Sequence, residues 1–157
     1  MKHLSTRTIA TGLGAALIAT AAFADSHAKL NPAVEARHHQ MQMIGYHIGI
    51  LGGMAKGEME FDAEMASGAA QNLNALAGMS KAALWVEGTA QGEVEGSRAK
   101  DEIWLDTEGF DERFEALASA SSALVGVADL EALRAGMGDL GGTCKACHEK
   151  YRGPKNE

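Results

Sequence analysis

Both cysteines of the chain lie within five consecutive residues near its C-terminus, Cys144-Lys145-Ala146-Cys147-His148. Positions three and four apart share one face of an α-helix, so a helix here would present both thiols and the imidazole in the same direction. A disulfide between residues three apart would close a very small loop and add almost no stability through chain entropy. The two thiols therefore indicate a bound group rather than a cross-link.

Three kinds of site use cysteines at this spacing. A redox-active pair of the thioredoxin kind needs a preceding strand, and no strand pattern precedes Cys144. A structural zinc site needs four ligands, so histidines elsewhere would have to supplement the two cysteines. The five residues match the attachment signature of haem c, in which each thiol adds to a vinyl group and the adjacent histidine binds the iron. We expect one covalent haem c per chain, attached through Cys144 and Cys147, with His148 as an axial iron ligand.

Apolar residues recur at spacings of three and four along the chain, which predicts four amphipathic helices. Few aromatic residues and only two prolines also favour helices over strands. The expected helices run from Asn31-Pro32 to Gly57, from Asp62 to about Trp85, from Thr107 to Val127, and from Asp129 to Gly153-Pro154. The polar stretch Glu87 to Asp106 has no clear period.

Short links at two of the three joints favour an all-α fold, an antiparallel four-helix bundle. The haem would be attached near the end of the C-terminal helix. Many of the expected core positions are Gly or Ala, so the side chains alone would fill the core poorly. A large planar cofactor between the helices would occupy that space.

The first 24 residues have the features of a secretory signal peptide. Lys2 and Arg7 make a basic start, an apolar run follows from Thr8 to Phe23, and Ala22-Phe23-Ala24 is a small-x-small cleavage pattern. A membrane anchor is the alternative, but the run is short for a spanning helix and rich in small residues. We expect residues 25–157 to form the mature domain in the periplasm, with no membrane span after cleavage.

The formal net charge of the chain is −7, and loss of the signal makes it more acidic. An acidic domain of this size repels nucleic acid, so a nucleic-acid partner is not expected. The charge could steer the domain toward a basic partner, but it does not identify the redox partner.

Three segments resemble the class II cytochromes c, the cytochrome c′ family. They are Cys144 to Arg152 (CKACHEKYR), Ser97-Arg98-Ala99-Lys100 followed by Ile103-Trp104, and Met54-Ala55-Lys56-Gly57-Glu58. A C-terminal haem site is itself distinctive, because the commoner class I cytochromes attach haem near the N-terminus. The resemblance spans nearly all of the mature chain. It implies a four-helix bundle, a periplasmic location and a homodimer through the first two helices.

The resemblance also implies roles for residues on the two haem faces. Met41 occupies the position of the first helix that covers the face opposite His148: a methionine there binds iron in low-spin members, whereas an apolar residue covers a vacant site in high-spin members. Arg37 matches an arginine near a haem propionate. Arg152 follows His148 by four residues, which places it on the proximal side of the haem or leaves it as a surface arginine at a helix end.

The sixth iron position has three candidate occupants. Methionine ligation by Met41 is expected, because this residue lies on the inward row of the first helix and a soft sulfur suits an electron carrier. His38 is one turn away, stands where the high-spin branch often has Gln, and would give a bis-histidine iron. The third candidate is a five-coordinate iron, with Met41 as a lid. His39 and His47 lie off the inward row and are expected on the surface.

The expected function is that of a one-electron carrier in which His148 and Met41 hold the iron. The alternative is a high-spin protein that binds nitric oxide or carbon monoxide. The sequence contains no recognisable nucleophile, base or substrate pocket, so we do not expect an enzyme. Peroxidase-like catalysis would need an open distal side, with a group such as His38 for acid–base chemistry.

Overall fold

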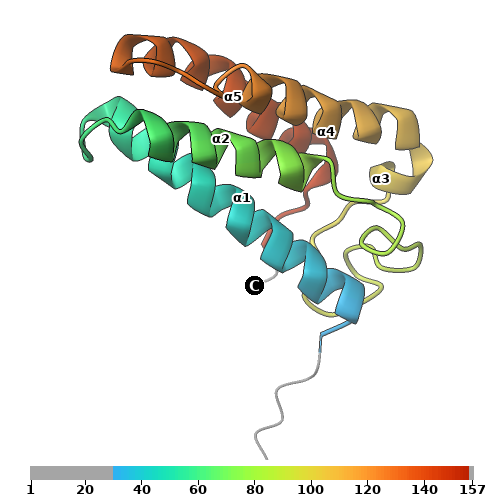
Figure 1. Ribbon diagram of the computed structural model, residues 1–157. Helices are drawn as coiled ribbons and strands as arrows, with labels where there is room; N and C mark the ends of the chain where they lie inside the picture. The colour runs from blue at the N-terminus through green and yellow to red at the C-terminus, as the bar shows by residue number, and fades with distance from the viewer. Residues whose placement is uncertain (1–29, 156–157) are drawn as a thin grey trace, which may run out of the picture.

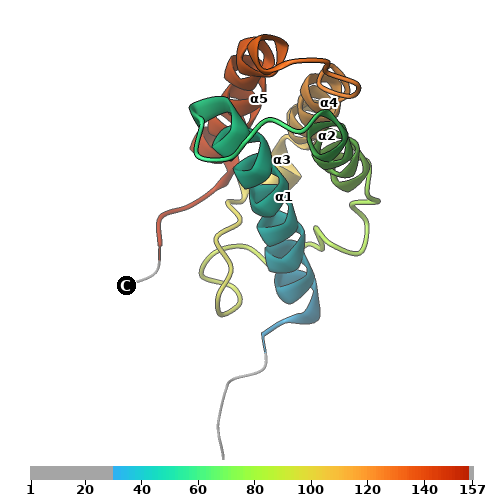
Figure 2. The ribbon, with the colours of Figure 1, turned by 60° about the vertical axis from the view of Figure 1, so that its left-hand side comes forward.

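The computed structural model describes residues 30–155, so the expected signal peptide, residues 1–24, lies outside the described residues. Its helices are α1 (Pro32–Lys56), α2 (Ala63–Ala77), α3 (Glu102–Leu105), α4 (Thr107–Ser122) and α5 (Leu130–Tyr151). Helices α1 and α4 each pack against both α2 and α5, and this arrangement forms a four-helix bundle (Figure 1). Figure 2 shows the four long helices from nearer their ends. The expected all-α four-helix bundle is confirmed.

Each long helix begins at an Asn or Asp whose side chain accepts a hydrogen bond from a backbone N–H of the first turn. These caps are Asn31 to Ala33 at 2.9 Å, Asp62 to Met65 at 2.8 Å, Asp106 to Gly109 at 3.2 Å and Asp129 to Ala132 at 2.8 Å. A cap of this kind typically contributes about 1 kcal/mol. At the other end of α1, Gly57 has a φ of 79°, a left-handed conformation that glycine adopts without strain.

Two helices are shorter than the periodicity predicts. Helix α2 was expected to reach Trp85 but ends at Ala77, because the chain turns at Gly78 and brings Trp85 against Phe110, with ring centroids 4.8 Å apart. Helix α4 was expected to reach Val127 but ends at Ser122. The short helix α3 lies within the stretch for which no period was visible.

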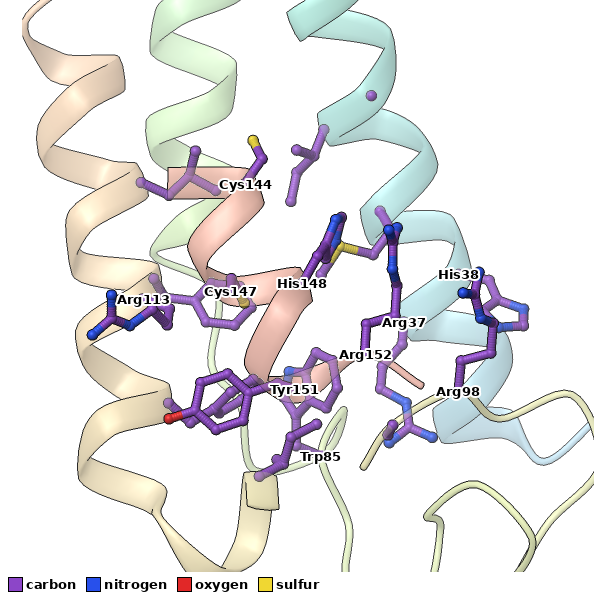
Figure 3. Close-up of a pocket in the computed structure, with 18 of the residues that line it drawn as sticks. Arg37, His38, Trp85, Arg98, Arg113, Cys144, Cys147, His148, Tyr151 and Arg152 are labelled. Carbon is purple, nitrogen blue, oxygen red and sulfur yellow. The ribbon is translucent and has the colours of Figure 1, made fainter. Parts of the chain in front are cut away.

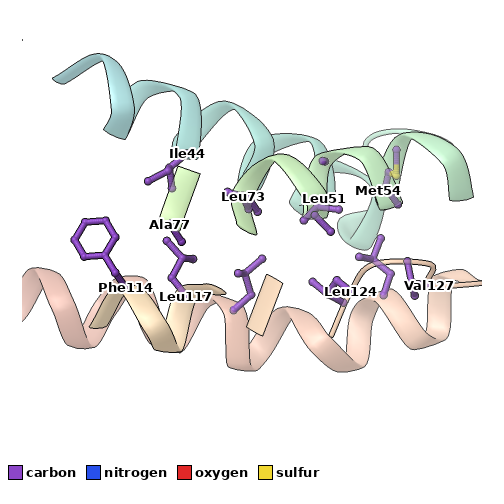
Figure 4. Packing of buried hydrophobic residues seen from close by; sticks show 14 of the residues in the cluster. Ile44, Leu51, Met54, Leu73, Ala77, Phe114, Leu117, Leu124 and Val127 are labelled. Atoms are coloured by element: carbon purple, nitrogen blue, oxygen red, sulfur yellow. The ribbon is translucent and has the colours of Figure 1, made fainter. Parts of the chain in front are cut away.

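The apolar core lies between all four long helices (Figure 4). Its fully buried large side chains include Leu51, Met54, Leu73, Leu133 and Leu140. Full burial of a side chain of this size contributes about 1.5–3 kcal/mol. Helix α2 adds several buried alanines, so its backbone approaches its neighbours closely.

His47 was expected on the surface, and the structure shows that this is wrong. Only 7% of His47 is exposed. It is one of the buried residues of α1, and Leu51 on the next turn is buried too. Its Nδ1 has no hydrogen-bond partner among the described residues.

No helix within residues 30–155 is both long enough and apolar enough to span a membrane.

Candidate cofactor site

A cavity of about 530 Å³ opens between α1, α4 and α5. Cys144, Cys147 and His148 all line it, and all three come from the last turns of α5 (Figure 3). Met41 and Arg37 of α1 line the same cavity, as does Arg152 at the end of α5. The structure therefore brings together every site residue expected from the sequence.

The two thiols are partly buried and are not joined to each other. The Sγ atom of Cys144 lies 3.6 Å from the carbonyl oxygen of Leu140, one turn earlier in α5. Burial raises the pKa of the Cys147 thiol to about 11, so this thiol is protonated near neutral pH. Both sulfurs thus stand on the cavity side of one helix, as the spacing predicted.

His148 lies between the two thiols and the end of the helix. Burial lowers the pKa of its imidazole, and the nearby cations Arg152 and Arg98 lower it further. Both effects favour the neutral ring, which has a free nitrogen lone pair and can bind a metal.

Helix α1 forms the wall of the cavity that faces α5. Val34, Met41, Ile44 and Ile48 provide apolar side chains at helical spacing. Gly45 adds none, and no atom outside its own helix turn and chain neighbours lies within 4 Å of the position that a Cβ would take there. This wall offers two groups that can bind iron, the thioether of Met41 and the imidazole of His38.

His38 lines the edge of the cavity rather than its middle. Its Cε1 lies 3.9 Å from the position of a Cβ on Gly96, so the ring packs toward the loop between α2 and α3.

Arg37 and Trp85 form one polar corner of a mostly apolar cavity. Arg37 is 4% exposed, and its Nη1 and Nη2 donate to the hydroxyl and the carbonyl of Thr89 at 3.0 and 3.1 Å. The guanidinium carbon lies 5.0 Å from the centroid of the Trp85 ring. The indole N–H of Trp85 is buried without an acceptor among the described residues. Sequence reasoning missed Trp85, because only the turn after Gly78 brings it to the site.

Arg98 is a second residue whose role at the site the sequence did not reveal. Gly153 donates its N–H to the carbonyl of Arg98 at 2.8 Å, and Nη2 of Arg98 donates back to the carbonyl of Gly153 at 2.7 Å. Lys100 N–H donates to the carbonyl of Tyr151 at 3.1 Å. These bonds fasten the loop between α2 and α3 to the end of α5 and hold Arg98 at the rim of the cavity.

The residues present fit a covalently bound haem. The cavity has the volume and the mostly apolar lining typical of cofactor sites. Two thiols and a neutral imidazole stand on one helix face, in the order that haem attachment needs. In Figure 3, Trp85 lies at the opposite end of the cavity from Cys144. Haem carries two propionate carboxylates on the edge away from its vinyl groups. The N–H of Trp85 and the guanidinium of Arg37 are a hydrogen-bond donor and a cation that suit such carboxylates.

Comparison with known families agrees with this chemistry. A family model described as Cytochrome C′ matches residues 32–152 of the chain. The chain belongs to the cytochrome c′ family. A cytochrome c-554 of Cereibacter sphaeroides is 38% identical over 145 residues, which cover 91% of this chain and 95% of that protein. A cytochrome c′ of the same organism is 38% identical over 150 residues, covering 93% and 97%.

Solved structures of cytochromes c′ have the same fold. The structure of cytochrome c′ from Rhodobacter Spheriodes matches with a TM-score of 0.74 and 37% identity. The match covers 78% of this chain and 96% of the other. A second cytochrome c′, which has an unusual ligand-controlled dimer dissociation, matches with a TM-score of 0.68 and 30% identity. This match covers 81% of this chain and 100% of the other. The cofactor of this cytochrome c′ family member is covalently attached haem c. The comparisons do not support placing the chain in the low-spin, Met-ligated branch.

Proposed function

We propose that this cytochrome c′ is a high-spin haem protein that binds nitric oxide or carbon monoxide on the haem face opposite His148. The observation that carries the proposal is the apolar wall of α1, where aliphatic side chains and the bare backbone of Gly45 face the cavity. A neutral diatomic molecule needs neither a charge nor a strong hydrogen-bond donor in such a site. The relationship to cytochromes c′ supports this reading over the Met-ligated carrier.

The proposed roles of the residues follow from their positions. Cys144 and Cys147 would hold the haem through thioether bonds, and the neutral imidazole of His148 would bind the iron. When bound, haem c would supply an iron that can bind both the imidazole of His148 and a diatomic ligand. Arg37 and the N–H of Trp85 hold a propionate, because a guanidinium and a buried donor without an acceptor both suit a carboxylate. Arg152 and Arg98 add positive charge on the His148 side.

In this proposal Met41 covers the distal face without bonding to the iron. A methionine side chain has several rotatable bonds and fills irregular apolar space, so it can move aside when a ligand enters. Partial burial of Met41 against the core is consistent with such a lid.

A one-electron carrier with Met41 as the second axial ligand is the other candidate function. It is favoured by the place of Met41 on the cavity wall opposite α5, where its thioether faces the same space as His148. Ligation by a soft sulfur would raise the reduction potential and leave no site for gases.

The visible spectrum of the reduced protein, recorded with and without carbon monoxide, separates the two candidates. Broad high-spin bands that shift with the gas are expected. Sharp, split bands that do not respond to carbon monoxide would contradict the proposal and favour the carrier. Replacement of Met41 by Ala should then create gas binding. If it does not, His38 becomes the candidate ligand.

The proposal includes export to the periplasm, with residues 1–24 as the signal, and a homodimer through α1 and α2. Met43 and Tyr46 of α1 and Met65 of α2 are exposed apolar residues that such an interface would cover. N-terminal sequencing of the exported protein tests the cleavage site. Analytical ultracentrifugation of the protein and of a Tyr46→Glu variant tests the dimer, which the variant should weaken.

A further inference from the structure

The charged residues of this acidic chain are unevenly distributed around the cavity. The whole chain has a formal net charge of −7. Yet within residues 30–155 the cavity is lined by four arginines and by no Asp or Glu; the arginines are Arg37, Arg98, Arg113 and Arg152. Even with two ionised haem propionates, this part of the protein keeps no excess of negative charge. The acidic residues therefore lie on other parts of the molecule.

The positive charge continues onto the surface beside the cavity. A shallow groove there, the basic groove, includes Arg98, Cys144, Lys145, His148, Glu149 and Arg152. Glu149 is the only carboxylate in its lining among residues 30–155. Cys144 and His148 belong to both the groove and the cavity. A molecule seated in the basic groove would thus lie against the same helix turn that carries the haem attachment.

The cations of the basic groove are accessible to a partner. The side chain of Lys145 is 77% exposed, and its 3.8 Å ion pair with Glu149 is a solvent-exposed contact of the weak, salt-screened kind. Arg152 is an exposed residue, and its guanidinium has no hydrogen-bond or ion-pair partner among the described residues. Lys155, which directly follows Pro154 of the groove lining, is exposed as well.

We infer that the basic groove is the docking site for an acidic redox protein that reduces the haem. Long-range attraction between opposite charges speeds association and orients the partner, and the effect is strongest at low salt. One electron passes from the partner to ferric iron, so the partner is oxidised by one electron while no bond, proton or group is transferred. The inference rests on the covalent haem of the proposed function, but not on what occupies its distal face.

Two small oxidants of opposite charge test the local field of the holoprotein. Stopped-flow oxidation of the reduced protein is followed with the anion ferricyanide and with the cation tris(phenanthroline)cobalt(III), from about 10 mM to about 300 mM ionic strength. If the basic groove controls the approach, the ferricyanide rate falls about tenfold as salt rises, and the cobalt rate rises or stays flat. If the net charge controls it, the two trends are reversed, and the docking inference is wrong.

Charge-reversal variants locate the effect. Lys145→Glu should abolish most of the salt dependence with ferricyanide. Lys155→Glu should remove part of the salt dependence. Because Lys155 lies outside the attachment motif, this variant can still be measured if Lys145→Glu impairs haem attachment. The matched control is Lys56→Glu, which makes the same change in net charge. Lys56 is 71% exposed, and it is the last residue of α1, at the end of the helix away from the cavity. Equal effects of all three variants would show that net charge alone acts, and would overturn the inference.

A redox-inert probe gives a second readout that is independent of the iron chemistry. Hexacyanochromate(III) is a paramagnetic anion that broadens the amide signals of residues near which it binds. The ferrous holoprotein is used under carbon monoxide, because its low-spin iron is diamagnetic and leaves the nearby amide signals sharp. We expect the first broadening at residues 98–100 and 145–155. Broadening that is centred elsewhere would contradict the docking site, even if the carbon monoxide spectrum supports the proposed function. Broadening at the expected residues, together with a spectrum that does not respond to carbon monoxide, would contradict the proposed function but not the docking site.

Discussion

The hydroxyl of Tyr151 donates a hydrogen bond of 2.8 Å to Oδ2 of Asp106. Tyr151 is the last residue of α5, three positions after His148, whereas Asp106 is the N-cap of α4. The same carboxylate pairs with Lys150 and accepts the cap hydrogen bond from Gly109. One side chain therefore starts α4 and also fixes the helix turn that follows the iron ligand.

This carboxylate should make stability depend on pH under acidic conditions. Hydrogen bonds from Lys150 and Tyr151 lower the pKa of Asp106 to about 2, from an ordinary value of 3.8. Because the folded-state value is depressed, the stabilisation is fully present above pH 3.8 and is lost as the pH falls toward about 2. We expect the urea midpoint of Asp106→Asn to be lower than that of the wild type near neutral pH, with the difference shrinking over this range.

Asn retains the cap acceptor but not the charge, so Asp106→Asn separates the two roles of this residue. Asp106→Ala should be less stable than Asp106→Asn at every pH, because it also loses the cap acceptor. A constant difference between wild type and Asp106→Asn from neutral pH to pH 2 would show that the depressed pKa contributes nothing to stability.

Met41 should control the rate at which gas enters the distal side. If Met41 is a lid, Met41→Ala removes the obstacle and raises the association rate of carbon monoxide by about tenfold, which corresponds to ~1.4 kcal/mol of barrier. Flash photolysis of the carbon monoxide complex measures this rate. Met43→Ala is the matched control, since Met43 is 46% exposed and does not line the cavity. An unchanged rate in Met41→Ala would exclude the lid.

The indole N–H of Trp85 should tune the haem through a propionate. Trp85→Phe keeps the ring contacts with Phe110 but removes the donor, so a propionate keeps more of its negative charge. That charge stabilises ferric iron, and we expect the reduction potential to fall by about 20–60 mV, where 59 mV is a tenfold change for a one-electron couple. The pKa of that propionate should also rise, which redox titrations at several pH values would detect.

Trp104→Phe is the control for this measurement. The N–H of Trp104 donates to the carbonyl of Trp85 at 3.0 Å, and Trp104 does not line the cavity. It should cost about 1 kcal/mol of stability with little change in potential. Equal shifts of potential in the two variants would mean that the Trp85 donor does not act on the haem.

Leu140 links the core to the attachment turn, so its truncation should be costly. It is fully buried, and its carbonyl accepts the hydroxyl of Thr143 at 2.8 Å, next to Cys144. Leu140→Ala should reduce the free energy of unfolding by about 2–5 kcal/mol. Leu105→Ala, at a leucine that is 83% exposed, should change it by less than about 0.5 kcal/mol. Urea denaturation of the two holoproteins would show whether burial accounts for the difference.

The parts of the fold that the sequence predicts correctly depend on neighbours along the chain. Asn31, Asp62 and Asp129 are recognisable caps because each acts on a helix that starts at the next residue. The same holds for the cysteines and His148, whose common face follows from helical spacing alone. Periodicity also identified the inward row of α1 that carries Met41.

The features that the sequence did not reveal depend on contacts between distant segments. Arg37 bonds Thr89 across 52 positions, and Arg98 bonds Gly153 across 55. Trp85 reaches the site only because α2 stops at Ala77, and packing against Phe110 and Phe114 overrides the apolar period that would have continued the helix. His47 is buried because α1 is covered on more than one side, which periodicity along a single helix does not show.

The reciprocal hydrogen bonds between Arg98 and Gly153 affect how the molecule opens. At the far end of the bundle, Leu51, Met54 and Leu133 pack in the apolar core, whereas at the cavity end Arg98 joins the loop to Gly153 through partly exposed polar bonds. Polar bonds near solvent break locally at much lower cost than a packed core. Native-state hydrogen exchange should therefore show two cooperative units, with the amides of residues 91–96, none of which is buried, exchanging well before those of Leu133 and Leu140. Such a result would mean that the loop at the haem end opens locally while the rest of the bundle stays folded.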